Sequence, residues 1–306
     1  MRQLVPFFMI ASLSLFALMS WADNGPEIVE NVPPAVTEDE TAQMESDHQT
    51  VTDHLADPNL RVLSWNFGGL NRKNSEFDRL ALVMNDADLV ILQDVEFGKS
   101  GENALTVIAE LLTRRQGVKV CKAWFKTFDG DRGRHAFLWK QNRVAIVTDR
   151  GQIVDECSEA PELLLRERVK SGDLYANTFF FRPLNQLLMV GSIQSDKSHT
   201  LKFNAPTSWP AIVFGDQGKS AGKAGDFRTG FKKAGGGRGG TQNFWFRDLQ
   251  LVGAEVLDLE ARFRELSSAE LKAGFPGRMP ILSEFSFADE KTETLKMKLI
   301  KRKTRR

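Results

Sequence analysis

The sequence predicts an α/β fold in which two β-sheets pack face to face and helices cover the outside. Strand and helix patterns alternate between residues 61 and 115, and this alternation indicates a parallel strand pair joined by a crossover helix. A series of strand patterns then runs to residue 287, with short polar links that are typical of hairpins. The chain has 306 residues, of which 42% are hydrophobic and 26% are charged. This composition is that of a globular protein large enough for one such domain.

The first four elements are recognised by their hydrophobic periodicity. RVLSWN (61–66) is a strand pattern, and SEFDRLALVMND (75–86) has apolar residues at helical spacing. ADLVILQDV (87–95) is a continuous apolar run that suits a buried strand, and NALTVIAELLTRR (103–115) is again helical. Further strand patterns follow at residues 118–128, 134–140, 143–148, 175–183, 185–194, 211–216, 243–259 and 280–287.

Residues 1–22 have the features of a secretory signal peptide. Arg2 gives a positive start, residues 4–19 form a continuous apolar stretch, and Ser20-Trp21-Ala22 is a cleavage site with a small residue at each end. We therefore expect Sec-type export to the periplasm or the medium. The alternative is an uncleaved membrane anchor, which leaves the same domain outside the membrane.

Charge is distributed unevenly along the chain, although the formal net charge is only +1. Residues 23–59 contain ten Asp and Glu and no Lys or Arg, a composition that predicts a disordered acidic spacer. Residues 291–306 contain eight Lys and Arg against one Glu and form a basic tail. Such a tail is either simply solvated or attracts a polyanion: nucleic acid, an anionic membrane surface or the protein's own spacer. The predicted folded domain is residues 60–290.

Residues 218–241 interrupt the strand patterns with nine Gly and six Lys or Arg against one Asp. We expect no regular structure in a segment so rich in glycine. It is either an unstructured insertion or a cationic flap that covers an anionic ligand. In the second case Lys219 and Lys223 are candidate phosphate-binding residues.

The stretch IVFGDQGKSAGK (212–223) resembles the end of a nucleotide-binding loop. A phosphate-binding P-loop requires a glycine five positions before the glycine of Gly-Lys-Ser, but that position is Val213. We therefore predict no nucleotide cofactor. The stretch is interpreted as a strand end that presents Asp216 at a sheet edge, with an ordinary turn as the alternative.

Cysteine and histidine are scarce. Cys121 and Cys157 are the two cysteines of the chain, and an exported protein permits a disulfide between them; two buried thiols are the alternative. Neither has His or Cys neighbours at ligand spacing, so no zinc site is predicted. Of the four histidines, His48 and His54 lie in the spacer, which leaves little material for histidine-based chemistry.

Polar residues follow the predicted strands in a characteristic order. They are Asn66, Asp94, Arg182, Asp216, Asp248 and Glu284. The segments that carry them are VLSWNFGGL, DLVILQDVE, FFFRP, IVFGDQG, FRDLQLV and ILSEFSF. In this order they resemble the motifs of the endonuclease/exonuclease/phosphatase superfamily, the DNase I-like metal-dependent phosphoesterases. The resemblance spans about residues 60–290 and implies a four-layer α/β sandwich with two mainly antiparallel sheets, whose strand ends line one cleft.

The resemblance also implies roles for individual residues. Asn66 matches the amide that follows the first strand, and Asp94 matches the metal-binding carboxylate of the leucine-glutamine-glutamate motif. Arg182 matches the phosphate-contacting arginine, and Asp216 matches the aspartate of the glycine-aspartate-phenylalanine-asparagine motif. With Glu284 as a further ligand, Asn66 and Asp94 are candidates for holding Mg²⁺ against a scissile phosphate.

Three positions depart from the family's pattern. Gly218 replaces the asparagine that follows the aspartate, Gln194 ends a strand that finishes in a catalytic histidine in the family, and Phe285 replaces the histidine of the terminal serine-aspartate-histidine motif. A phenyl ring neither accepts nor donates a proton. His135 and His199 are interpreted as surface or structural histidines. General acid–base catalysis contributes roughly 10² to 10⁴ in rate, so we expect little activity from such a site.

These observations predict an exported protein of this fold with an eroded catalytic site, a pseudoenzyme or a phosphate- and polyanion-binding module. The alternative is an active Mg²⁺-dependent phosphodiesterase or nuclease that uses a modified site, in which Glu96 is able to take over from Asp94. A third interpretation is a scaffold in the cell envelope, with the acidic spacer and the basic tail as its adhesive parts.

Overall fold

The computed structural model describes residues 57–73, 76–125, 133–148, 151–154, 157, 166–169, 172–195, 209–216, 227–230 and 242–287. For residues 166–169, 172, 173, 194, 195, 216 and 242 only the backbone is described. The predicted signal peptide, most of the predicted spacer and the basic C-terminal residues lie outside these ranges. The predicted start of the domain is residue 60, but the folded chain begins earlier. The backbone oxygens of Asp57 and Asn59 accept hydrogen bonds from Arg143 at 2.7 and 2.6 Å. Within the described ranges, no helix has the length and hydropathy needed to cross a membrane.

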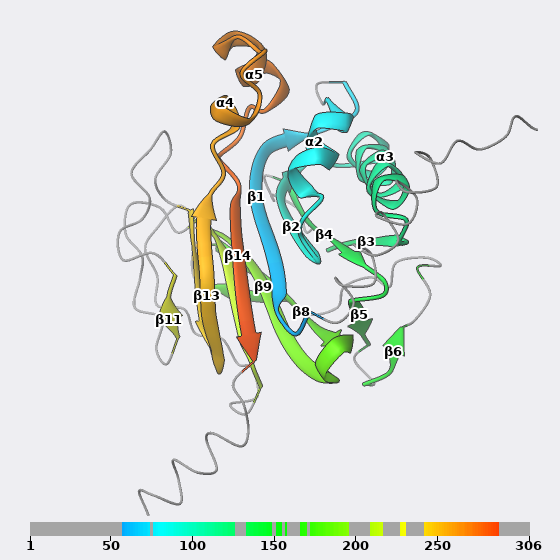
Figure 1. Ribbon diagram of the computed structural model, residues 1–306, viewed down its shortest axis with the longest axis vertical. Coiled ribbons are helices and arrows are strands. Elements are labelled where there is room, and N and C mark those ends of the chain that lie inside the picture. Colours follow the sequence, from blue (N-terminus) through cyan, green and yellow to red (C-terminus); the bar gives the residue numbers. More distant parts are fainter. Residues whose placement is uncertain are drawn as a thin grey trace, which may run out of the picture. The chain divides into compact units, whose positions relative to one another are not determined.

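The two predicted sheets are confirmed (Figure 1). The six-stranded sheet contains, in spatial order, β13 (Leu249–Val256), β14 (Ile281–Phe287), β1 (Leu60–Leu70), β2 (Leu89–Val95), β4 (Arg134–Lys140) and β3 (Val120–Trp124). The eight-stranded sheet contains β11 (Arg228–Thr229), β12 (Gln242–Arg247), β10 (Ala211–Asp216), β9 (Gln186–Ser195), β8 (Gly172–Phe181), β5 (Val144–Val147) and β6 (Ile153–Val154), with β7 (Arg166–Val169) paired to β8. Each sheet has one parallel pair, β1/β2 and β10/β9, and the other described pairs are antiparallel.

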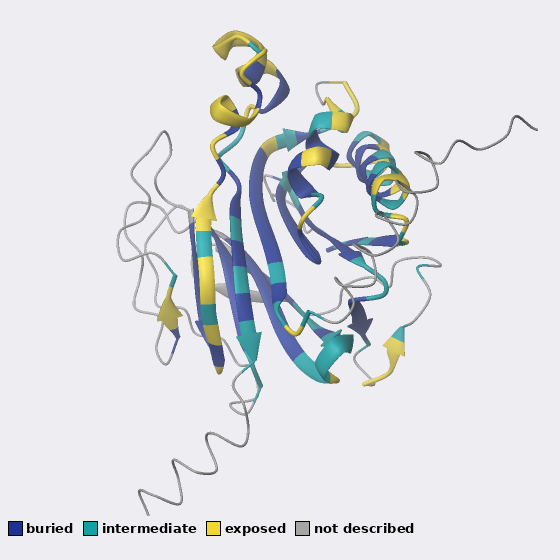
Figure 2. Cartoon of the chain, viewed as in Figure 1, coloured by how far each residue is buried: buried dark blue, intermediate teal, exposed yellow. Residues whose placement is uncertain are grey.

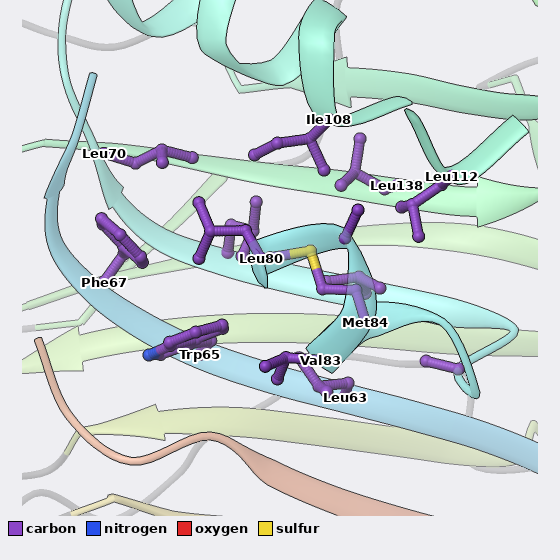
Figure 3. Packing of buried hydrophobic residues seen from close by; sticks show 14 of the residues in the cluster. Leu63, Trp65, Phe67, Leu70, Leu80, Val83, Met84, Ile108, Leu112 and Leu138 are labelled. Atoms are coloured by element: carbon purple, nitrogen blue, oxygen red, sulfur yellow. The ribbon is translucent and has the colours of Figure 1, made fainter. Parts of the chain in front are cut away.

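Helices cover one outer face of this sandwich. The predicted helices are α2 (Phe77–Met84) and α3 (Lys99–Gln116), which begin and end within a few residues of the predicted bounds. Their apolar faces pack on the outer face of the six-stranded sheet, where Trp65, Leu80 and Ile108 belong to one buried cluster (Figure 3). The other helical elements of the described residues are a 3₁₀ turn (Arg182–Leu184), α4 (Leu259–Arg262) and α5 (Ser268–Gly274). None of these covers the outer face of the eight-stranded sheet.

The space between the sheets is filled by a second, aromatic cluster. Val62 and Ile91 face it from the six-stranded sheet, and Phe214 and Phe244 face it from the other. Alternate residues of each strand point into this layer, which explains why the central strands in Figure 2 are almost entirely buried. Edge strand β13 is mostly exposed by contrast. Burial on both faces accounts for the continuous apolar runs in the sequence.

Two predicted segments differ in detail from the structure. The run 243–259 is not one strand, because Asp248 adopts a left-handed φ of 56° and passes the chain from β12 in one sheet to β13 in the other. The glycine-rich segment 218–241 is not wholly irregular. Its residues Arg228 and Thr229 form β11, and the guanidinium of Arg228 lies 4.7 Å from the ring centroid of Phe246. Packing on an aromatic strand therefore outweighs the low strand propensity of the surrounding glycines.

Cys121 and Cys157 form a disulfide, with their Cα atoms 5.1 Å apart and a sequence separation of 36. The alternative of two free thiols is thereby excluded. The bond ties β3 of one sheet to the segment that follows β6 of the other. Replacing both cysteines by serine is expected to lower the free energy of unfolding by roughly 2 to 4 kcal/mol, because the unfolded chain gains the freedom that the crosslink removes. Urea denaturation of the oxidised and double-serine proteins measures the difference, and equal midpoints would contradict the estimate.

A buried ion pair lies at the N-terminal end of β2. Arg143 is 2% exposed, and its Nε lies 3.2 Å from Oδ1 of Asp88. Lys140 approaches the same carboxylate at 3.8 Å. Burial lowers the pKa of the Lys140 ammonium from its ordinary value of 10.5, an effect that the charge of Asp88 opposes. The pair anchors the start of the domain, since Asp88 also accepts a hydrogen bond from the backbone nitrogen of Arg61 at 3.0 Å.

The lowered pKa of Lys140 predicts a specific pH dependence of stability. The unfolded chain binds the proton more tightly than the folded one, so this residue makes stability rise as pH rises from its lowered pKa towards about 10.5. Lys140→Met removes this contribution to the pH dependence of stability. We expect the stability advantage of the methionine variant to be largest near neutral pH and to shrink as the pH approaches 10.5. Urea denaturation at several pH values tests this, and a difference independent of pH would contradict it.

Candidate functional site

The ends of four strands meet at one end of the sandwich. Gln93, the residue before Asp94, is fully buried and reaches across between the sheets. Its Nε2 donates hydrogen bonds to Oγ of Ser192 on β9 at 3.1 Å and to the backbone oxygen of Phe214 on β10 at 3.4 Å. Asn66 pairs with Gln93 along the parallel β1/β2 ladder. The C-terminal ends of β1, β2, β9 and β10 therefore lie close together, and we call this region the strand-end site.

A buried polar network forms the floor of the strand-end site. Nδ1 of His135, on β4, lies 2.7 Å from Oγ of Ser192, and the imidazole stacks on Tyr175 with ring centroids 4.4 Å apart. His135 is 2% exposed. Its interpretation as a structural histidine fits this environment. Gln93 and Ser192 do not stand out in the sequence, because a lone polar residue inside an apolar strand does not show whether it faces a partner.

Asn66 lies where a tight backbone crossing fixes the end of β1. Its side chain faces the layer between the sheets and is 7% exposed as a residue. The backbone nitrogen of Arg278 donates to the backbone oxygen of Asn66 at 2.7 Å. A Cβ at Gly277 would overlap the backbone of Asn66 and Phe67, so only glycine permits this approach. The segment before β14 is thus held against Asn66, a predicted site residue.

Asp94 occupies an unusual backbone conformation at the end of β2. Its φ is 60°, a left-handed value that is uncommon for residues other than glycine. Its carboxylate Oδ1 lies against Gly133, where an added Cβ would overlap it and would lie 2.8 Å from the Cα of Asp94. Glu96, the predicted substitute ligand, is exposed two residues further along. The position of Asp94 is therefore strongly constrained by the chain around it.

Both Asn66 and Asp94 lie where the regular ladder is interrupted. The β1/β2 register shifts between Asn66 and Leu70, and the β2/β4 register shifts between Leu92 and Val95. Bulges of this kind re-aim side chains and are frequent next to binding and active sites. The β1/β2 ladder is regular up to Asn66, and Asp94 lies within the interruption of the β2/β4 ladder.

Asp216 and Gln194 are brought to the same site by the parallel β10/β9 pair, in which they are direct partners. Asp216 also pairs with Gln242 on β12. The structure describes their backbones, and the roles of the two side chains remain predictions. Gly218, Lys219, Lys223 and His199 lie outside the described residues.

Glu284 and Phe285 do not belong to the strand-end site. They lie in the middle of β14, where they pair with Arg61 and Leu60. Because β14 runs antiparallel to β1, Leu60 is at the far end of β1, six residues or roughly 20 Å from Asn66 at about 3.3 Å per residue. Glu284 instead accepts a hydrogen bond from Nδ2 of Asn59 at 2.6 Å. The predicted metal ligand and the predicted histidine position are therefore separated from Asn66.

Phe285 has a structural role. It is fully buried, and its ring packs edge-on against Phe244 and Phe246, with centroids 5.8 and 5.6 Å apart. The residues of the β14 side that do approach Asn66 are those just before the strand, FPGRMP (275–280), which contain no histidine. This side of the site therefore lacks a histidine, as predicted, but the segment that lacks it is 275–280 and not the one around Phe285.

Arg182 also lies at the opposite end. It follows β8, whose last residue, Phe181, pairs with Gln186 at the beginning of β9. Gln194 pairs with Asp173, near the beginning of β8. Eight residues, or roughly 26 Å at about 3.3 Å per residue, separate Gln186 from Gln194. The Nε of Arg182 donates to the backbone oxygen of Gln141 at 2.7 Å, so this arginine does not serve the strand-end site.

The described residues of the strand-end site do not fit a magnesium ion. Mg²⁺ requires a near-octahedral set of oxygen ligands and usually one or two carboxylates that are free to coordinate. Asp94 is packed against Gly133, and Glu284 is at the far end of β14. No group of three His, Cys, Asp or Glu side chains is placed to hold a metal within the described ranges. Asn66 and Asp94 alone are too few ligands for such a site.

Comparison with known proteins gives similarity at the level of structure. No protein-family model and no curated protein matches the sequence. This chain is similar in structure to endonuclease/exonuclease/phosphatase proteins. Similar structures include a humanized TDP2 of D. rerio (13% identity, TM-score 0.48, 75% of this chain and 100% of that chain). A second similar structure is the human Nocturnin catalytic domain with bound sulfate (14% identity, TM-score 0.47, 76% of this chain and 94% of that chain). A third is a mannosyl-6-phosphatase of Bacteroides thetaiotaomicron (14% identity, TM-score 0.45, 74% of this chain and 100% of that chain). These values assign no activity, ligand or partner to this chain.

Proposed function

We propose that this protein is an exported phosphate- or polyanion-binding protein whose strand-end site lacks efficient hydrolytic chemistry. The composition of the site supports the proposal. It offers an amide at Asn66, a constrained carboxylate at Asp94 and a second amide residue, Gln194, beside Asp216. His135 is packed beneath the site rather than presented in it. No other histidine lies among the described residues, and a phosphoesterase without a histidine to transfer protons loses roughly 10² to 10⁴ of its rate.

Export is supported by two independent features. Residues 1–22 have the pattern of a signal peptide, and the Cys121–Cys157 disulfide suits the oxidising conditions outside the cytosol. The basic residues of 218–241 and 291–306 favour nucleic acid, another polyanion or an anionic membrane surface as partner. Export is tested by fusing residues 1–22 to a reporter enzyme that is active only after export. A reporter that stays inactive would argue against it.

A second function is favoured by the backbone at Asp94. Strained φ values and bulges are concentrated at active sites, and both occur here. They support an active Mg²⁺-dependent phosphodiesterase or nuclease in which Asp216 supplies the missing carboxylate. On this alternative, Mg²⁺ supplies charge for the transferred phosphoryl group.

One experiment separates the two functions. The mature protein, residues 23–306, is assayed with Mg²⁺ or Mn²⁺ on DNA, RNA, a phospholipid and a phosphomonoester, and metal binding is measured by calorimetry. The proposed function expects no hydrolysis above the blank and no metal binding near millimolar concentration. Robust hydrolysis that Asp216→Ala abolishes would overturn it and establish the enzyme.

A further inference from the structure

We propose that Arg278 is the anion-binding residue of the strand-end site and binds the phosphate of the ligand without a metal ion. The inference rests on the proposed function, since it names the group that holds the phosphate. Arg278 was not singled out from the sequence, which pointed to Arg182 instead. In the structure Arg182 lies at the opposite end of the sandwich, whereas Arg278 lies next to Asn66.

Arg278 is located beside Asn66. Ile281 pairs with Ser64 at the start of β14, and the three residues before it continue along β1 towards its C-terminal end. The hydrogen bond from the backbone nitrogen of Arg278 to Asn66 fixes the end of this path. Arg278 therefore lies at the same end as Asp94 and Asp216, and it is half-buried.

Close contacts fix the backbone immediately before Arg278. The Cα of Gly277 lies 3.1 Å from the Cβ position of Gly68, which has a φ of +76°. Gly277 in turn has no room for a side chain against Asn66 and Phe67. Two backbone segments thus cross in direct contact immediately before Arg278. Because the backbone here is already fixed, ordering this segment adds little to the cost of binding, so more of the interaction energy appears as affinity.

The positive charge of Arg278 suits a phosphate ligand. A phosphate placed beside Asp94 and Asp216 needs a compensating positive group, and the described residues do not fit a metal ion. Arg134, on β4 at the same end, is 2.7 Å from Glu102 and lies over the ring of Phe97 at 5.7 Å. Among the residues that the structure describes, Arg278 is the arginine whose backbone is hydrogen-bonded to Asn66. A guanidinium is charged at every physiological pH and presents a planar fork that matches two phosphate oxygens.

The test uses the mature protein with two small probes, phenyl phosphate as a monoester and dimethyl phosphate as a diester, in the presence of EDTA. Small probes report on the strand-end site rather than on the basic tail. We expect Arg278→Gln to weaken binding of the preferred probe by roughly 10- to 100-fold, the loss of a charge-assisted hydrogen-bonded pair. Arg278→Lys should be intermediate, because it keeps the charge and loses the fork. Arg182→Gln, a half-buried arginine at the opposite end, is the matched control and should change affinity less than twofold.

The outcomes separate the two proposals. Wild-type binding in EDTA with an unchanged affinity in Arg278→Gln would overturn the role of Arg278 and leave the proposed function standing. An equal loss in both glutamine variants, or a requirement for Mg²⁺, would likewise overturn it. Wild-type protein that binds neither probe with or without Mg²⁺ would overturn the role of Arg278 and the phosphate-binding form of the proposed function. Should Arg278→Gln fail to fold, the Nε–Hε NMR signal of Arg278 in the wild type decides, since it must shift when the probe is added.

Discussion

Asp88→Ala is expected to lower the free energy of unfolding by roughly 3 to 5 kcal/mol, because it leaves a buried guanidinium without its carboxylate. Arg143 is 2% exposed, and its Nε and Nη2 lie 3.2 and 3.3 Å from the two carboxylate oxygens of Asp88. The rest of the guanidinium is bonded to the backbone oxygens of Asp57 and Asn59. Water therefore cannot replace the lost carboxylate without opening the start of the domain.

Asp86→Ala provides the matched control for this prediction. Asp86 is exposed and only two residues away, so its removal should change stability by less than about 0.5 kcal/mol. A double variant, Asp88→Leu with Arg143→Met, removes both charges and should lose less stability than Asp88→Ala alone. Urea denaturation of the four proteins measures these differences. A loss in Asp88→Ala no larger than that in Asp86→Ala would show that the pair is not a stabilising anchor.

The buried ion pair illustrates what the sequence did not predict. Strands and helices were found because their apolar periodicity is local, and the parallel β1/β2 pair followed from the strand-helix-strand order. Asp88 and Arg143 are separated by 55 residues, and neither stands out in its own segment. Their pairing depends on β2 and β4 being neighbours, which is a property of the folded sheet. The same holds for Gln93 and Ser192, which belong to different sheets.

Strand direction explains which site predictions the structure brings together. Asn66, Asp94, Gln194 and Asp216 lie at or towards the C-terminal ends of strands that belong to the two parallel pairs, so these ends share an edge of each sheet. Arg182 ends β8, which is antiparallel to β9, and the end of that strand is at the other edge. The sequence shows where a strand ends, but not which way it runs in the sheet. Arg278 was missed for the same reason, because it precedes an antiparallel strand.

Gly277→Ala is expected to reduce stability by roughly 4 kcal/mol or more, because the added methyl group must displace main chain. Its Cβ would overlap the backbone oxygen of Asn66 and the carbonyl group of Phe67. No side chain can rotate away to make room. The segment that carries Arg278 and the end of β1 therefore have to separate, and the hydrogen bond between Arg278 and Asn66 is lost with the contact.

This separation gives Gly277→Ala a second effect that an ordinary core substitution lacks. If Arg278 holds the phosphate beside Asn66, moving the two apart weakens phenyl phosphate or dimethyl phosphate binding even at temperatures where the variant is fully folded. Gly253→Ala is the control, because a Cβ there has no neighbour within 4 Å and stability should change by less than about 0.5 kcal/mol. Unfolding and probe binding are measured on both variants. A folded Gly277→Ala protein with wild-type affinity would show that the crossing stabilises the fold without positioning the site.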